Sequence, residues 1–167
     1  MPIIDSILSE IDFELATTLR VLERVPQEHL QWTPHPKSMS LGKLAWHIAA
    51  LPARVQVMLR EGEFDVTTAR PAEMPDQPGA IPAALRRHME DLRAYIATLS
   101  DEALKERFTL RAGPQVLQQI PKIGVIRTIL MNHTYHHRGQ LAVYLRLLNI
   151  PVPAIYGTSA DEGPGAK

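Results

Sequence analysis

The stretch that decides the fold of this chain is Asn132-His133-Thr134-Tyr135-His136-His137-Arg138-Gly139-Gln140, which places three of the seven histidines within five residues. It lies near the end of a long helical pattern that starts at Pro121, and proline is tolerated in the first turn of a helix. Residues four apart on an α-helix differ by only about 40° around the axis and lie one turn apart. The His133 and His137 imidazoles can therefore converge on one ion, and imidazole is a common ligand of divalent transition metals.

The two histidines belong to a row of mainly apolar residues on this helix. Its members follow one another at intervals of three or four residues: Ile126, Leu130, His133, His137, Leu141 and Tyr144. Such a row predicts a core-facing stripe, where an unpaired imidazole carries a desolvation cost. Two interpretations stay open on pattern alone: a pair of metal ligands, or two core histidines satisfied by hydrogen bonds.

Outward from this helix, apolar residues recur at helical spacing in three earlier segments. Ser40 can cap the second of them, and prolines or glycines follow the ends. The predicted helices cover residues 2–24, 41–62, 80–99 and 121–148.

The segments between these helices are rich in proline and glycine. Residues 25–39 and 62–80 are predicted to be connecting loops. Ser100 begins a short capped turn, and the residues around Gly113-Pro114 can form a short hairpin. Four long helices without a convincing sheet predict an all-α fold, a four-helix bundle with long connectors.

The length of 167 residues suits one domain with one core. We expect a single helical-bundle domain over residues 1–158 and a disordered tail over 159–167, which is rich in small and polar residues.

A third metal ligand must come from elsewhere in the chain, and His47 is the best candidate. It lies on the apolar stripe of Leu44, Ile48 and Leu51 in the second helix. Bundles build metal sites from side chains on facing helices, although a lone histidine on an apolar face is more often structural.

His136 points about 100° away from His137 but lies three residues from His133, so an alternative pair at that edge stays open. We prefer a supporting or surface role for it. His29 and His35 lie in a connector and His88 follows Arg86-Arg87, so we expect no functional role for these three.

Composition excludes several classes of protein. Lys plus Arg and Asp plus Glu number 18 each, which argues against binding to nucleic acid or to anionic lipid. Without cysteine there is no disulfide, thiolate nucleophile or thiolate ligand.

Thr134 stands where a zinc peptidase of the H-E-x-x-H type has its glutamate, so peptidase chemistry by that route is not expected. The chain shows no signal peptide and no long apolar run, so we expect a soluble, cytoplasmic protein.

Three segments together resemble the DinB-like family, which includes metal-dependent hydrolases related to YfiT and thiol-dependent transferases. They are His47 within Leu-Ala-Trp-His-Ile-Ala-Ala-Leu, the stretch from Asn132 to Leu141, and the ending Pro153-Ala154-Ile155-Tyr156-Gly157. The resemblance covers nearly the whole chain. It implies a four-helix bundle of the DinB/YfiT-like type, often a homodimer, with a divalent metal ion on His47, His133 and His137.

The residues after His137 also match the family motif. We expect Arg138 to form an ion pair, Gly139 to make a close helix contact and Gln140 to line the cavity. Val143, Leu147 and Leu148 extend the apolar surface of the last helix beyond one stripe, which favours a homodimer.

Three imidazoles leave a coordination position open, as in catalytic metal sites. We therefore expect a metal-dependent enzyme that uses Ni, Zn, Fe or Mn for hydrolysis or thiol transfer on a small molecule, with a low-molecular-weight thiol as a possible cosubstrate. His136, Gln140 and Tyr156 are candidate catalytic residues. The alternative is a non-catalytic, stress-related dimeric bundle that binds a metal or another ligand.

Overall fold

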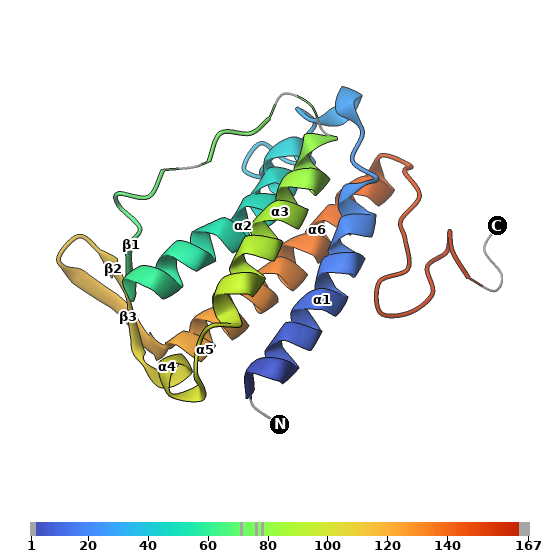
Figure 1. Ribbon diagram of the computed structural model, residues 1–167. Helices are drawn as coiled ribbons and strands as arrows, with labels where there is room; N and C mark the ends of the chain where they lie inside the picture. The colour runs from blue at the N-terminus through green and yellow to red at the C-terminus, as the bar shows by residue number, and fades with distance from the viewer. Residues whose placement is uncertain (1–2, 71, 76, 78, 164–167) are drawn as a thin grey trace.

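Four long helices dominate the structure (Figure 1), a computed structural model that describes residues 3–70, 72–75, 77 and 79–163. They are α1 (Ile3–Leu22), α2 (Leu41–Glu61), α3 (Ala80–Ile96) and α6 (His133–Leu147). Helix α2 packs against α3 and α6, and α1 packs against the same two helices. These contacts enclose one apolar core of mainly Leu, Ile, Val, Ala and Met side chains, as the composition predicts.

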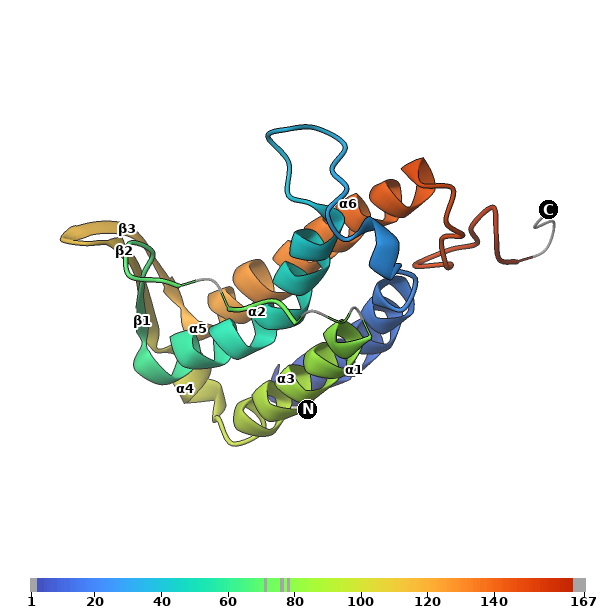
Figure 2. The ribbon, with the colours of Figure 1, turned by 90° about the horizontal axis from the view of Figure 1, so that it is seen from above.

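Helix α2 has well-defined ends. The Ser40 Oγ accepts a hydrogen bond from the Lys43 N–H at 3.3 Å, which satisfies one of the free donors of the first turn. Gly62 ends the helix in the left-handed conformation, with φ of +71°, and its N–H donates to the Met58 carbonyl at 3.0 Å. Pro52 lies inside the helix, where it cannot donate a backbone hydrogen bond. Figure 2 shows α2 bending along its length, as an internal proline explains.

The predicted helix over residues 121–148 is present as one continuous helical run, but its middle is not α-helical. A short turn, α5 (Lys122–Gly124), leads into the π-helical segment η2 (Val125–Asn132), which ends where α6 begins at His133. A π-helix has i→i+5 hydrogen bonds and is frequently found beside functional sites. The apolar row predicted across this run is buried at Ile126, Leu130 and Leu141.

A small sheet corrects the all-α prediction. Its order is β1 (Glu63–Asp65), β2 (Arg107–Ala112) and β3 (Gln115–Pro121), with β1 parallel to β2 and β2 antiparallel to β3. The hairpin around Gly113 is confirmed, and this glycine takes a positive φ of 56°. β1 was predicted to be loop, and three residues are too few to show the alternation that identifies a strand.

Two short helical elements complete the connections. The capped turn predicted at Ser100 is α4 (Asp101–Lys105), where the Ser100 Oγ accepts from the Ala103 N–H at 3.1 Å. The first connector contains a turn of 3₁₀-helix, η1 (Gln27–His29).

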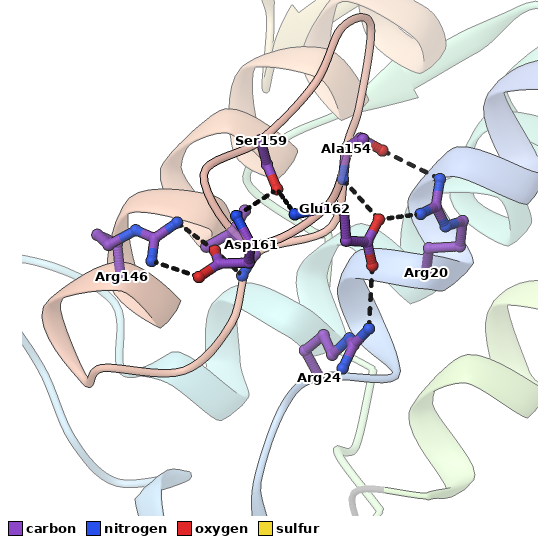
Figure 3. A network of polar contacts seen from close by, with 8 residues as sticks. Arg20, Arg24, Arg146, Ala154, Ser159, Asp161 and Glu162 are labelled. Atoms are coloured by element: carbon purple, nitrogen blue, oxygen red, sulfur yellow. Dashed lines mark hydrogen bonds and ion pairs between the residues drawn. The ribbon is translucent and has the colours of Figure 1, made fainter. Parts of the chain in front are cut away.

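The C-terminal segment after α6 lies beside α1 and is held by two carboxylates (Figure 3). Asp161 pairs with Arg146 and accepts from the Val152 N–H at 2.9 Å. Glu162 pairs with Arg20 and with Arg24. The prediction of a disordered tail from residue 159 differs from the structure over 159–163. The local sequence could not reveal this order, because the arginines that bind the segment lie on helices distant in sequence. Residues 164–167 lie outside the described part.

In the described residues, no helix combines the length and the apolar character needed to cross a membrane.

Candidate metal centre

Three histidines from two helices meet in the contact between α2 and α6. His47 comes from α2, and His133 and His137 come from the first turns of α6. The His133 Nε2 lies 3.2 Å from the His47 Nε2 and 2.7 Å from the His137 Nε2. One ligand atom from each residue lies within 4.8 Å of the other two. The structure thus brings together the three residues that helical spacing singled out.

This arrangement fits a divalent ion. Two nitrogens bound to a tetrahedral zinc, each at about 2.0–2.1 Å, lie roughly 3.3 Å apart. The separation of 3.2 Å between His47 and His133 matches this value, and the separation of 2.7 Å between His133 and His137 is shorter. Imidazole nitrogens are ligands that nickel, zinc and iron all accept. A metal ion can therefore be held here by nitrogen alone, and the donor set does not choose among these metals.

The three imidazoles are held in the uncharged form that a metal requires. Burial is the main cause that lowers the pKa of His47 to about 4, and the neighbouring histidines and Arg54 lower it further. Burial also lowers the pKa of His133, followed by the effects of His137, His136 and Arg54. The pKa of His137 is lowered by burial as well. The lowered pKa values favour the neutral form of all three rings at pH 7, in which each ring has one nitrogen with a free lone pair.

Gln140 fixes which nitrogen of His137 is free. The His137 Nδ1 lies 2.7 Å from the Gln140 Oε1. An amide oxygen can only accept, so Nδ1 carries the hydrogen and Nε2 keeps the lone pair that faces the other two histidines. Hydrogen bonds of this kind orient metal ligands in many proteins. Gln140 itself is exposed and contributes through His137, and it is not among the residues that line the cavity beside His47.

His136 lies beside the cluster on the exposed side of α6. Its ring centroid is 4.9 Å from that of His137, but it is not among the three grouped residues. The alternative ligand pair of His133 and His136 therefore finds no support in the geometry.

The remaining histidines are outside the cluster. His88, for which we expected no functional role, is half-buried, and its Nδ1 donates to the Ala49 carbonyl of α2 at 2.9 Å. His29 is half-buried in η1, and the exposed His35 accepts from the Lys37 N–H at 3.1 Å.

Arg138 faces the opposite side of α6 and forms a buried polar network with α1. Its side chain is 1% exposed and pairs with Glu14 at 2.7 Å, which confirms the predicted ion pair. It also donates to the Thr18 hydroxyl at 3.0 Å and to the Tyr156 hydroxyl. Tyr156, a candidate catalytic residue, has its described hydrogen bonds within this network, to Arg138 and Glu14.

The close helix contact predicted at Gly139 is wrong, since a Cβ at this position would meet no atom within 4 Å.

A cavity of about 520 Å³ opens beside His47. One wall is a single face of α2 that includes Lys43, Trp46 and Arg54, and residues Ala72 and Met74 of the connector between β1 and α3 form another. Arg54 was not predicted from the sequence, although its spacing from His47 was a usable signal. It follows His47 by seven residues, so the two side chains lie only about 20° apart around the helix.

Comparison with known proteins gives consistent results. The sequence model of the DinB superfamily matches residues 10–141. The chain is 28% identical over 163 residues to the uncharacterized protein YrdA of Bacillus subtilis strain 168, covering 95% of this chain and 91% of YrdA.

Two crystal structures share the fold. A DinB-like protein of Bacillus subtilis, YjoA, superposes with a TM-score of 0.71 at 19% identity, covering 92% of this chain and 99% of that one. A DinB-like protein of Bacillus cereus ATCC 10987 superposes with a TM-score of 0.72 at 23% identity, covering 91% and 97%. At these identities the likeness concerns the fold alone.

Proposed function

This chain belongs to the DinB superfamily, and on that premise we propose that it is a metal-dependent enzyme that acts on a small molecule at the three-histidine centre. The observation that carries the proposal is the convergence of three neutral imidazoles beside a cavity large enough for a substrate. Structural zinc sites are closed by four protein ligands, whereas catalytic sites have three and keep a position open. The group found among the described residues has three members.

A bound divalent ion would supply a Lewis acid that polarises a substrate or makes a water or thiol more acidic. Around it, the residues of the chain have separate tasks. His47 and His133 present neutral nitrogens because burial disfavours their protonation. Gln140 orients the His137 ring, and the cavity beside His47 holds the substrate. The exposed His136 is our candidate for accepting or delivering a proton at the edge of the site.

Two reaction types are compatible with this centre: hydrolysis, and transfer of a low-molecular-weight thiol to an electrophile. The chain has no cysteine, so the thiol would be a cosubstrate. Nickel, zinc, iron and manganese all remain candidates, because affinity alone does not choose among them.

The first experiment is elemental analysis of untagged protein, followed by metal titration. We expect one divalent ion per chain, and we expect His47→Ala, His133→Ala and His137→Ala each to weaken binding strongly. His136→Ala is the matched control, because it removes an imidazole one residue from a ligand. Unchanged affinity in His47→Ala, or a larger loss in His136→Ala than in His137→Ala, would contradict the assignment.

The second experiment is a turnover screen of the metal-loaded protein with hydrolysable esters and amides, and with thiols paired with electrophiles. Activity should disappear on chelation and return when the metal is restored. Activity that survives complete chelation would remove the metal from the mechanism.

A further inference from the structure

We propose that the substrate of this centre is an anion with an apolar portion, and that the Arg54 guanidinium binds its anionic group in the cavity beside His47. The inference rests on the proposed function, since it assigns a substrate class to the same site. It concerns Arg54, which forms no ion pair among the described residues and is not one of the three grouped histidines.

The cavity is built so that a ligand in it must lie alongside His47. Lys43, Trp46, His47, Ala50 and Arg54 line it at helical intervals of three and four residues along α2. Lys43 lies one turn before His47 and Arg54 two turns after it, so the two cations flank the histidine on one face. A molecule that contacts Arg54 therefore lies along the same wall as His47.

The charge of the cavity is one-sided. Its lining includes the Lys43 and Arg54 side chains and contains no carboxylate among the described residues. Arg54 follows His47 by seven residues, two turns along the same face of α2, and both residues line this cavity. A divalent ion would add more positive charge, so a neutral or cationic substrate would gain little here.

Arg54 differs from most arginines of this chain in lacking an acidic partner among the described residues. It is half-buried at the cavity wall. Arg60, six residues later on the same helix, is exposed and lies over the Tyr95 ring, with its Cζ 4.4 Å from the centroid. A guanidinium that is partly removed from water and has no anionic partner is stabilised most when an anion binds to it. Its planar arrangement of N–H donors suits carboxylate, sulfonate or phosphate.

The rest of the lining predicts the apolar portion of the ligand. Trp46, Leu51, Met39 and Met74 give the cavity a mainly apolar wall. The Trp46 Nε1 donates to the Ala72 carbonyl at 2.8 Å and ties the connector to α2. Figure 2 shows the described part of this connector passing along α2. A second cavity of about 360 Å³ shares Trp46, Ala50, Arg54 and Ala72 with the first, so Arg54 borders both cavities.

The test measures ligand binding to protein stripped of metal, with the chelator removed, so that no ion can attract the anion. A Trp32→Phe background leaves Trp46 as the single tryptophan reporter in the cavity wall. The probes are pairs that differ mainly in charge: phenylbutyrate with phenylbutyramide, and phenylpropanesulfonate with phenylpropanesulfonamide. Phenyl phosphate is a third anion, so carboxylate, sulfonate and phosphate are compared directly.

We expect each anion of the two pairs to bind about tenfold more tightly than its neutral partner, the difference typical of one charge-assisted hydrogen bond. Arg54→Gln should abolish that preference and leave the neutral probes unchanged, and Arg54→Lys should restore part of it. Arg60→Gln is the matched control, since it removes the same charge from the same helix outside the cavity, and it should have no effect.

Three results would overturn the inference: no preference for the anions, a preference that persists in Arg54→Gln, or no saturable binding of any anion up to about 10 mM. Metal titration of the same proteins separates the two proposals. Anion binding through Arg54 without metal binding would support the anion site but reject the metal-dependent enzyme, and with it the assignment of the anion as its substrate. Metal binding without anion preference would do the reverse.

Discussion

Gln140 shows how a single exposed side chain can control the metal centre without touching the metal. Its amide oxygen accepts from the His137 Nδ1 and so commits Nε2 to the cluster. We predict that Gln140→Ala lowers metal affinity about tenfold, the lower end of the range for such supporting residues. Gln140→Glu should keep most of the affinity because it retains an acceptor. Competition with a chromogenic chelator measures both, and an unchanged affinity in Gln140→Ala would disprove the role.

Arg138 and Glu14 allow a second prediction at the residue scale, this time about stability. Their side chains are 1% and 12% exposed, so either one alone would be a buried charge without its partner. We expect Arg138→Met and Glu14→Gln each to reduce the free energy of unfolding by about 3–5 kcal/mol, and the double variant to lose less than the sum. Urea denaturation provides the measurement.

The control for this pair is Arg93→Met. Arg93 pairs with Asp12 at the surface, where the two side chains are 42% and 50% exposed. Its loss should cost at most about 1 kcal/mol. Equal effects at Arg93 and Arg138 would mean that burial does not set the strength of the Arg138 pair.

Residues that share one helix could be predicted from their spacing, whereas contacts between helices could be predicted only where both residues lie on core-facing apolar stripes. His133 and His137 were found because a spacing of four is visible in the chain. The convergence of His47 on them depended on both apolar stripes facing the core. The partner of Arg138 could not be identified, because Glu14 lies 124 positions away and no local pattern links the two. Arg54 could have been predicted by helical spacing as well, because it lies seven residues after His47 on the same face of α2.

At the scale of elements, the C-terminal segment should respond to acid before the helices do. A hydrogen bond from the Arg146 guanidinium is the main cause that lowers the pKa of Asp161, and a hydrogen bond from the Ala154 N–H is the main cause that lowers the pKa of Glu162. A carboxyl pKa that is lower in the folded state stabilises the fold above its unfolded pKa. That stability is lost as the pH falls through the folded value.

We therefore predict that residues 150–163 detach below about pH 4 while the helical signal persists. Hydrogen exchange of the segment compared with far-ultraviolet circular dichroism tests this. Asp161→Asn combined with Glu162→Gln should release the segment at neutral pH, whereas Asp101→Asn, a change in the first turn of α4, should not. Simultaneous loss of both signals in acid would contradict the prediction.

The long helices were predictable because each repeats its apolar spacing over many turns. The exceptions are short or depend on distant partners. β1 has three residues and exists because it pairs with β2, where Phe64 lies opposite Leu110, 46 positions further along the chain. The π-helical geometry of Val125–Asn132 leaves the apolar row intact, so the row alone cannot distinguish it from an α-helix.

At the scale of the whole molecule, an exposed apolar strip on α6 supports the proposal of a homodimer. Val143 and Leu147, four residues apart, are 57% and 58% exposed. We predict a dimer that Val143→Glu combined with Leu147→Glu converts to a monomer, because two charges would enter the interface. Light scattering gives the mass. Val116→Glu on the hairpin, where Val116 is 49% exposed, is the matched control. A wild-type monomer at high micromolar concentration would reject the dimer.

The π-helical segment makes the chain unequally sensitive to changes of length. A π-helix typically accommodates one more residue than an α-helix between the same flanks. Deletion of the exposed Thr128 should therefore be absorbed by a return to α geometry, with one ion still bound per chain. Deletion of His136 would instead turn His137 by about 100° relative to His133 and abolish binding. Metal titration of the two deletions distinguishes them. A one-residue deletion is thus tolerable just before the ligands and intolerable between them.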